Sequence, residues 1–122
     1  MLGLMPGTDA KLGDVYQVYR NVTLRPAAFG EKLTRPCACV AERPLDTVWS
    51  ALPRLSSDIQ ATDLQSPAST GIGLERDGAW SLRWIHEVRR EKTGGPACAF
   101  LGALADAERR ELLVYYRNRH AA

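Results

Sequence analysis

Proline and glycine residues divide this chain into short segments, and this division constrains the fold more than any other feature. Prolines stand at positions 6, 26, 36, 44, 53, 67 and 96, and several glycines add further breaks. Proline removes a backbone donor and fixes φ, so it is confined to the ends and edges of regular elements. The apolar and β-branched residues between these breaks form short runs, which are typical of strands.

The short runs predict several strands joined by long loops. We expect strands at 15–19, 36–41, 47–52, 80–84 and 97–101, with Pro44 and Pro53 ending the second and third and a bend near Ile85. The segments 21–32 and 56–73 are expected to be long loops, the latter with one short helical turn near 58–64.

The C-terminal segment differs from the rest because its pattern is helical. Asp106 is expected to cap a helix on which Leu112, Leu113 and Tyr116 share a face. A chain of 122 residues can bury one hydrophobic core. We expect a flexible leader at 1–11 and a single domain at 12–122. The sequence therefore predicts a mainly β domain, a small twisted barrel or sheet closed by one helix.

The cysteines and the charges exclude several classes of protein. Cys37 and Cys39 lie two apart in an apolar run, and only two histidines accompany the three cysteines. We therefore expect buried thiols in a reducing cytosol rather than disulfides or a metal site. No run approaches the ~20 apolar residues of a membrane span. The formal net charge of +2 excludes a polycationic nucleic-acid coat, although it allows a local basic patch.

Three segments, taken in order, resemble one protein family. Residues 13–18 (GDVYQV) look like an opening Gly-Asp strand, and residues 30–36 (GEKLTRP) look like a glycine–glutamate loop that leads into an Arg-Pro pair. Residues 74–78, the strand around Trp80, and residues 105–112 look like late strands and a closing helix. By their order and spacing, these segments make the chain from about Leu12 to Tyr116 resemble the PemK/MazF toxin–antitoxin ribonucleases.

The resemblance implies both a fold and a function. The fold would be an SH3-like barrel, similar to the gyrase poison CcdB and usually paired as a homodimer. The function would be that of a cytoplasmic toxin, neutralised by a cognate antitoxin protein, that cuts single-stranded RNA at short motifs without a metal or other cofactor. In that reaction the ribose 2′-hydroxyl attacks the adjacent phosphate. It needs a cation for the phosphorane, a proton donor and a base.

The resemblance also implies catalytic residues. Arg35 matches the family's catalytic arginine, and Pro36 biases it toward extended backbone. Glu31 matches a loop glutamate that would orient the arginine or assist proton transfer. The family's second catalytic position, a Ser or Thr hydroxyl, falls on Leu55, which cannot donate a hydrogen bond. Either Ser56 takes this role, or the site is weakened, or the fold binds a protein target such as gyrase instead.

Further residues are expected to contact the RNA: Lys32, Thr34, Arg54, Arg83 and His86. The alternatives are that Arg54 is an exposed strand-end cation and that His86 is structural or solvated. Trp84 alternates with Leu82 and Trp80, so we expect it in the core, with base stacking as the alternative.

Overall fold

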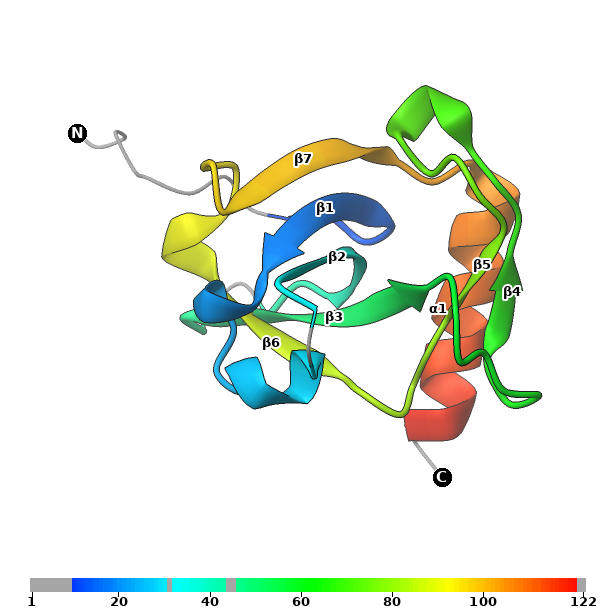
Figure 1. The fold of residues 1–122 in the computed structure, drawn as a ribbon, viewed down its shortest axis with the longest axis horizontal. Coiled ribbons are helices and arrows are strands. Elements are labelled where there is room, and N and C mark those ends of the chain that lie inside the picture. The colour runs from blue at the N-terminus through cyan, green and yellow to red at the C-terminus, as the bar shows by residue number, and fades with distance from the viewer. Residues whose placement is uncertain (1–9, 31, 44–45, 121–122) are drawn as a thin grey trace.

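A computed structural model describes residues 10–30, 32–43 and 46–120. The predicted leader at 1–11 therefore falls almost entirely outside the described residues. In the part of the chain that is described, seven antiparallel strands form an open sheet with one C-terminal α-helix (Figure 1). The predicted mainly β class is confirmed. None of the described helices is both long and apolar enough to span a membrane.

The strands follow one path through the sheet. They are β1 Asp14–Tyr19, β2 Thr34–Ala41, β3 Val48–Leu55, β4 Leu64–Ser66, β5 Gly78–Trp80, β6 His86–Arg89 and β7 Cys98–Ala103. Their order is β4-β5-β3-β2-β1-β7, and β6 pairs with β3 off this path. Short 3₁₀ helices connect them: η2 Arg20–Val22, η3 Pro26–Phe29, η4 Thr70–Ile72 and η5 Arg90–Lys92. The predicted loop at 21–32 therefore contains most of η2 and all of η3.

The central strand β2 buries residues on both of its faces. On one face, Cys37 and Cys39 pack with Tyr16 and Trp49 in one apolar cluster. Ala38 and Val40 on the other face belong to a second cluster, which includes Leu112 of the helix. Strand alternation produces this division. All three cysteines of the chain are buried free thiols, as predicted.

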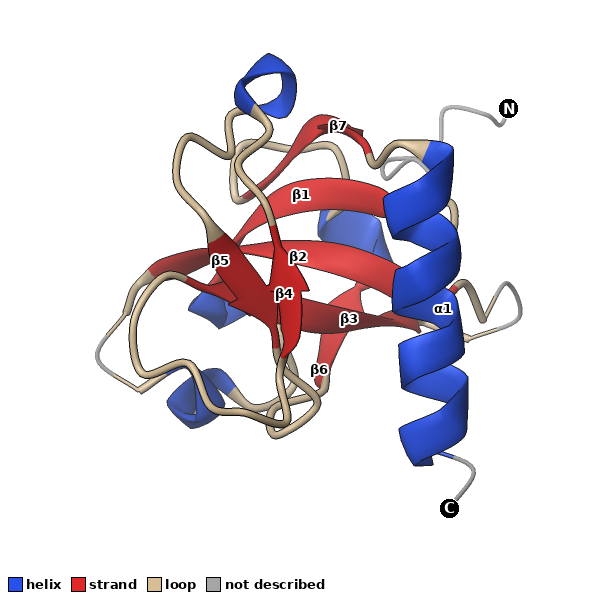
Figure 2. Ribbon diagram, turned by 90° about the vertical axis from the view of Figure 1, so that its right-hand side faces the viewer, coloured by secondary structure: helices blue, strands red, loops and turns tan. Residues whose placement is uncertain are grey.

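The helix α1 Asp106–His120 covers the second cluster, and Figure 2 shows it crossing the ends of β1, β2 and β3. Leu112 is fully buried, and Leu113 and Tyr116 pack beside it, so the predicted apolar face is confirmed. The carbonyl oxygen of Ala105 accepts the first helical hydrogen bond, from the N–H of Arg109. Asp106 is therefore the first helical residue rather than the predicted cap.

The prediction that the third strand stops at Pro53 is wrong, because β3 continues through this residue. Pro53 pairs with Cys37 of β2, and its carbonyl oxygen accepts a hydrogen bond from the N–H of Ser81 on the opposite side. The N and C=O of one strand residue point to the same side. The position of the missing N–H therefore lies away from β2, where the pairing of β3 passes from β6 to β5. Pro53 therefore lies between the hydrogen-bonded pairing with β6 and that with β5, and it interrupts neither of them.

Two other predictions fail between residues 56 and 85. The segment 56–73 contains β4 and η4, and within 58–64 a single hydrogen-bonded turn, from the N–H of Asp63 to the carbonyl oxygen of Gln60, takes the place of the predicted helical turn. The predicted strand at 80–84 ends at Trp80, since the chain leaves the sheet and turns at 82–83, before the predicted bend at Ile85. Ser81 is buried, whereas Trp84 is 45% exposed. The alternation of apolar residues there does not reflect alternate burial.

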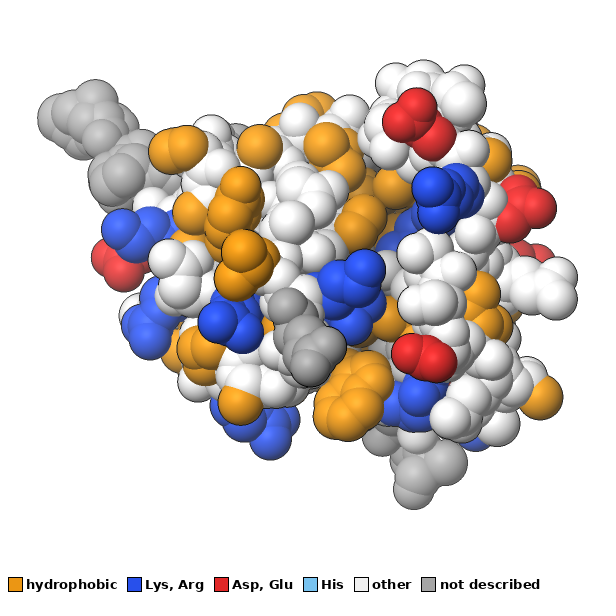
Figure 3. All heavy atoms as spheres, viewed as in Figure 1, with side chains coloured by type: hydrophobic (Ala, Val, Ile, Leu, Met, Phe, Trp, Pro, Cys, Tyr) orange, Lys and Arg blue, Asp and Glu red, His pale blue; other side chains and the backbone are white. Residues whose placement is uncertain are grey.

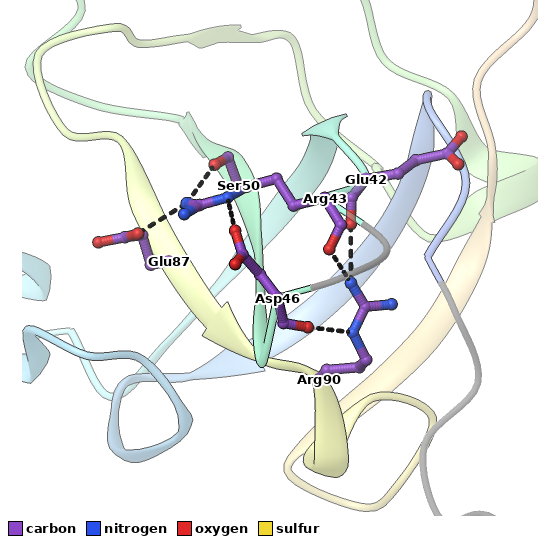
Figure 4. A network of polar contacts seen from close by, with 6 residues as sticks. All are labelled: Glu42, Arg43, Asp46, Ser50, Glu87 and Arg90. Atoms are coloured by element: carbon purple, nitrogen blue, oxygen red, sulfur yellow. Dashed lines mark hydrogen bonds and ion pairs between the residues drawn. The ribbon is translucent and has the colours of Figure 1, made fainter.

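Two arginines hold the turn between β2 and β3 against β6 (Figure 4). Arg43 donates to the carboxylates of Asp46 at 2.8 Å and of Glu87 at 2.7 Å. Arg90 donates to the carbonyl oxygens of Glu42, Arg43 and Asp46. This network stabilises one end of the β2–β3 hairpin, and the candidate site lies at the other end.

Candidate functional site

A pocket of about 370 Å³ lies where β2 begins and β3 ends, beside η3. Its walls include Phe29 of η3, Arg35 of β2, Leu55 of β3 and Trp84 from the turn before β6. On the side of the molecule where η3 lies, Figure 3 shows Lys and Arg side chains beside hydrophobic ones. The volume falls within the range of pockets that hold a small ligand.

The register of β2 and β3 places Arg35 and Leu55 together. Cys37 pairs with Pro53 and Ala38 with Leu52, and the same register continued by two residues sets Arg35 opposite Leu55. Strand alternation then directs both side chains to the face of the first apolar cluster, where both line the pocket. The position at which the resemblance calls for a hydroxyl thus faces the arginine, but it carries an alkyl side chain.

Arg35 is a partly buried cation. Its Nη2 donates to the carbonyl oxygen of Phe29 at 3.5 Å, and burial lowers the pKa of the guanidinium. The group still stays charged at neutral pH. Among the described residues no carboxylate forms an ion pair with it. A desolvated guanidinium without such a partner is stabilised by an anion, and its planar fork suits a phosphate.

Two further cations, Lys32 and Arg83, line the pocket. Nη2 of Arg83 lies 2.8 Å from a carboxylate oxygen of Asp63, whose side chain is 1% exposed, and it also donates to the carbonyl oxygen of Asp58. Burial alone would raise the pKa of Asp63, but the hydrogen bonds from Arg83 and from a backbone N–H outweigh burial and lower it. Because Asp63 offsets the charge of Arg83, the free positive charge comes from Lys32 and Arg35, against the Asp58 carboxylate at the pocket wall.

A serine hydroxyl is present at the pocket, but at a residue other than the predicted one. Both serines are exposed, but only Ser57 lines the pocket. The strand β3 ends at Leu55, and the chain bends at residues 56–58, so strand alternation does not decide between the two serines. The bend brings Ser57 to the pocket wall.

Trp84 is also a pocket residue, which corrects the expectation that it belongs to the core. Its side chain is 45% exposed and lies at the pocket wall. Trp80, in contrast, is fully buried. The physical reason is the turn at 82–83, which takes Trp84 out of the strand that the alternation predicted.

The structure does not place Arg54 on an RNA-binding surface. Arg54 is only 6% exposed and lies on the face of β3 opposite Leu55. Its Nε donates to Ser66 Oγ at 2.9 Å, and its Nη2 donates to the carbonyl oxygens of Ser66 and Arg76, both at 2.8 Å. Burial lowers its pKa. The side chain holds the segment around β4 to the sheet, so it is not the exposed strand-end cation of the alternative either.

His86 is likewise buried rather than available to RNA. It is 2% exposed, and its ring lies 4.4 Å from the ring of Phe29, behind the pocket wall. Burial, and then the charges of Arg35 and Arg25, lower the pKa of His86 to about 4. The imidazole is therefore neutral at neutral pH, and its Nε2 has no hydrogen-bond partner among the described residues.

The remaining predicted residues are Thr34 and Glu31. Thr34 Oγ1 accepts a hydrogen bond from Gln17 Nε2 at 2.7 Å. Strand alternation turns Thr34 to the side of β2 opposite Arg35, away from the pocket wall. Glu31 lies outside the described residues, so its role stays a prediction.

Charge distinguishes this pocket from two others. A pocket of about 480 Å³ has Arg89 and Arg90 at its wall, but Asp46 and Glu91 balance them. Another, of about 300 Å³, has only neutral side chains and Asp77 at its wall. Among the described residues, no group of three or more His, Cys, Asp or Glu could hold a metal ion. Of these three pockets, the one at Arg35 therefore fits an anionic ligand best.

Comparisons with known proteins do not identify the chain. No protein-family model matches it, and no curated protein matches it either. The resemblance to the PemK/MazF family therefore rests on the sequence motifs, and the geometry of the pocket is the independent observation beside it.

Proposed function

We propose that this protein is a metal-independent endoribonuclease that cleaves single-stranded RNA and acts as the toxin of a toxin–antitoxin pair. The observation that carries the proposal is Arg35, a partly buried guanidinium that forms no ion pair among the described residues, although the charge of the Asp58 carboxylate at the pocket wall acts on it. It lines a pocket together with Lys32, Ser57 and the exposed ring of Trp84. A cation, a hydroxyl and an aromatic face are the groups that a short stretch of RNA requires.

The same proposal includes the finer fold assignment, an SH3-like barrel of the CcdB and PemK/MazF type that forms a homodimer. Its support is the arrangement of the strands. The strand β3 pairs with β2 along one edge, and with β6 and then β5 along the other, so β3 is an inner strand of the sheet. The helix α1 packs on the second apolar cluster. A second copy would double the basic side chains presented to RNA.

In the proposed reaction the 2′-oxygen attacks the adjacent phosphorus as the bond from phosphorus to the 5′-oxygen breaks. The guanidinium of Arg35 holds the nonbridging oxygens, where negative charge builds up in the phosphorane. Ser57 donates a hydrogen bond to one of these oxygens. A base takes the proton of the 2′-hydroxyl, and an acid or water gives a proton to the leaving 5′-oxygen. Glu31, predicted to orient the arginine or to assist proton transfer, is the candidate for one of these proton transfers. The products are a 2′,3′-cyclic phosphate and a 5′-hydroxyl.

The experiment that tests this function is cleavage of a long single-stranded RNA in EDTA, with the cut sites mapped by primer extension. We expect a small set of sites that share a short motif, and 2′,3′-cyclic phosphate ends. An RNA with a 2′-deoxyribose directly before the cut phosphate should stay intact there, because it lacks the nucleophile. Uncut RNA at high protein concentration would contradict the proposal.

A second function is favoured by one observation, the alkyl side chain of Leu55 opposite Arg35. Without a hydroxyl at this position the fold would be a binding protein that poisons a protein target, as CcdB poisons gyrase. Expression in growing cells separates the two functions. Growth arrest with fragmented RNA supports the ribonuclease, and growth arrest with intact RNA supports a protein target.

A further inference from the structure

The three tryptophans of this chain have different environments. Trp49 and Trp80 are fully buried, whereas Trp84 is 45% exposed. An exposed indole at the wall of a pocket presents an aromatic face to whatever ligand the pocket holds. Trp84 lies at the wall of the pocket that contains Arg35 and Lys32, so a ligand held by these cations would lie next to the ring.

The turn that carries Trp84 is held in place before any ligand arrives. The neighbouring Arg83 is bound to the Asp63 carboxylate at 2.8 Å and to the carbonyl oxygen of Asp58 at 3.0 Å. Asp63 is itself buried and accepts a hydrogen bond from the N–H of Gln60. These bonds tie the turn to the segment 58–63, so the ring belongs to a preformed wall of the pocket. A preformed aromatic surface binds without a large ordering cost.

We infer that Trp84 is a stacking platform for one nucleobase of a single-stranded nucleic acid whose phosphate lies at Arg35. This inference rests on the proposed function, since it assigns the base-binding half of the same site. Every nucleobase has a face that stacks on an indole, so this subsite adds affinity at one nucleotide without selecting its identity strongly. The pocket volume of about 370 Å³ suits a single nucleotide rather than a longer stretch.

Tryptophan fluorescence tests the inference directly, because the two other indoles are buried. The probe is a 12-nucleotide single strand with 2′-deoxyribose throughout, which binds without being cut. We expect the oligonucleotide to quench the emission and to protect Trp84 from acrylamide. Binding seen by anisotropy of a labelled strand, without any change in indole emission or acrylamide access, would overturn the inference.

Two substitutions measure the contribution of the ring. Trp84→Leu keeps an apolar side chain but removes the aromatic face, and it should weaken oligonucleotide binding about five- to a hundredfold. Trp84→Phe retains an aromatic face and should lose much less. A strand with abasic sites should bind the wild-type protein and Trp84→Leu equally. Equal affinity of wild-type protein and Trp84→Leu for the normal strand would overturn the inference, whereas a thermal melt checks that both variants fold.

The failure of this inference can be told apart from the failure of the proposed function. Binding of the uncleavable strand that depends on Trp84, in a protein that never cuts RNA, supports the stacking platform and contradicts the ribonuclease. Conversely, a protein that cuts RNA with unchanged substrate affinity after Trp84→Leu is a ribonuclease without this platform. A protein that neither cuts RNA nor binds the uncleavable strand contradicts both.

Discussion

The register of β2 and β3, continued two residues beyond the Cys37–Pro53 pair, sets Arg35 opposite Leu55, and both residues line the pocket beside η3. A guanidinium and an alkyl chain thus occupy the two positions where the resemblance calls for an arginine and a hydroxyl. Ser57, in the bend that follows β3, supplies a hydroxyl at the same pocket wall. Cleavage at this site therefore depends on whether the Ser57 hydroxyl can donate a hydrogen bond to the phosphate in place of the hydroxyl that is missing at Leu55.

The first prediction concerns that hydroxyl. Ser57→Ala should lower the rate of RNA cleavage about ten- to a hundredfold, because it removes a hydrogen-bond donor to the phosphorane. Ser56→Ala is the matched control and should cleave at the wild-type rate, since Ser56 is exposed and lies outside the pocket wall. Adding Leu55→Thr to Ser57→Ala should restore part of the rate. Equal rates for the two alanine variants in a single-turnover assay would argue against Ser57.

A second prediction concerns Arg54, the buried arginine that does not line the pocket. Arg54→Met should lower the free energy of unfolding by about 3 kcal/mol or more, because it leaves buried carbonyl groups without their donor. Denaturant titration measures this loss. The folded fraction of the variant should still bind a single-stranded oligonucleotide with wild-type affinity. A large loss of affinity with unchanged stability would instead place Arg54 in the RNA site.

A third prediction is a pH dependence of stability that His86 causes. The pKa of this group is about 4 in the folded protein and near 6.5 when it is unperturbed, so between these values only the unfolded chain takes up the proton. Stability should therefore fall by about 3 kcal/mol as the pH drops from 6.5 to 4, and this group adds no further loss below that.

The variant His86→Phe isolates this contribution from the carboxylates that titrate in the same range. It keeps a ring against Phe29 and removes the titrating group. The His86→Phe variant lacks the loss of stability that His86 causes. Its free energy of unfolding should therefore rise relative to that of the wild type as the pH falls to 4. A difference that does not change with pH would show that His86 titrates normally.

A fourth prediction concerns the ion pair that fixes the turn before β6. Asp63→Asn should destabilise the protein by about 1–3 kcal/mol, since it removes the charge that offsets Arg83. Because the pKa of Asp63 lies below 3.8, this contribution is present above that pH and is lost as the pH falls through the folded pKa. Thermal melts of both proteins should converge in strong acid. Melting temperatures that differ equally at every pH would contradict this assignment.

The local sequence pattern was enough to predict several of the strands and the C-terminal helix. The segments around β1, β2 and β7 and the face of α1 were correctly identified, since short apolar runs and helical periodicity depend on neighbouring residues. The prediction failed at Pro53, because whether a proline ends a strand depends on which partner strand lies beside its missing N–H. That partner, β5, is distant in sequence, and its pairing with β3 was not predicted.

The site was harder to predict than the frame. Arg35 and Lys32 were identified from the motif, and the structure places both at the pocket. The exposure of Arg54, His86 and Trp84 could not be read from the sequence, because tertiary packing sets it. Arg54 is buried beneath the segment around β4, and the turn at 82–83 leaves Trp84 exposed. The position of Ser57 at the pocket depends on a bend after β3, which the local pattern did not predict.

The central claim is that Arg35 cleaves RNA, and one measurement tests it most directly. Single-turnover cleavage of a mapped RNA site in EDTA is compared for wild type, Arg35→Ala and Arg110→Ala, the last an exposed arginine of α1. We expect Arg35→Ala to lose at least a hundredfold in rate with an unchanged melting temperature. Arg110→Ala should cleave like the wild type. Wild-type cleavage by Arg35→Ala would contradict the account.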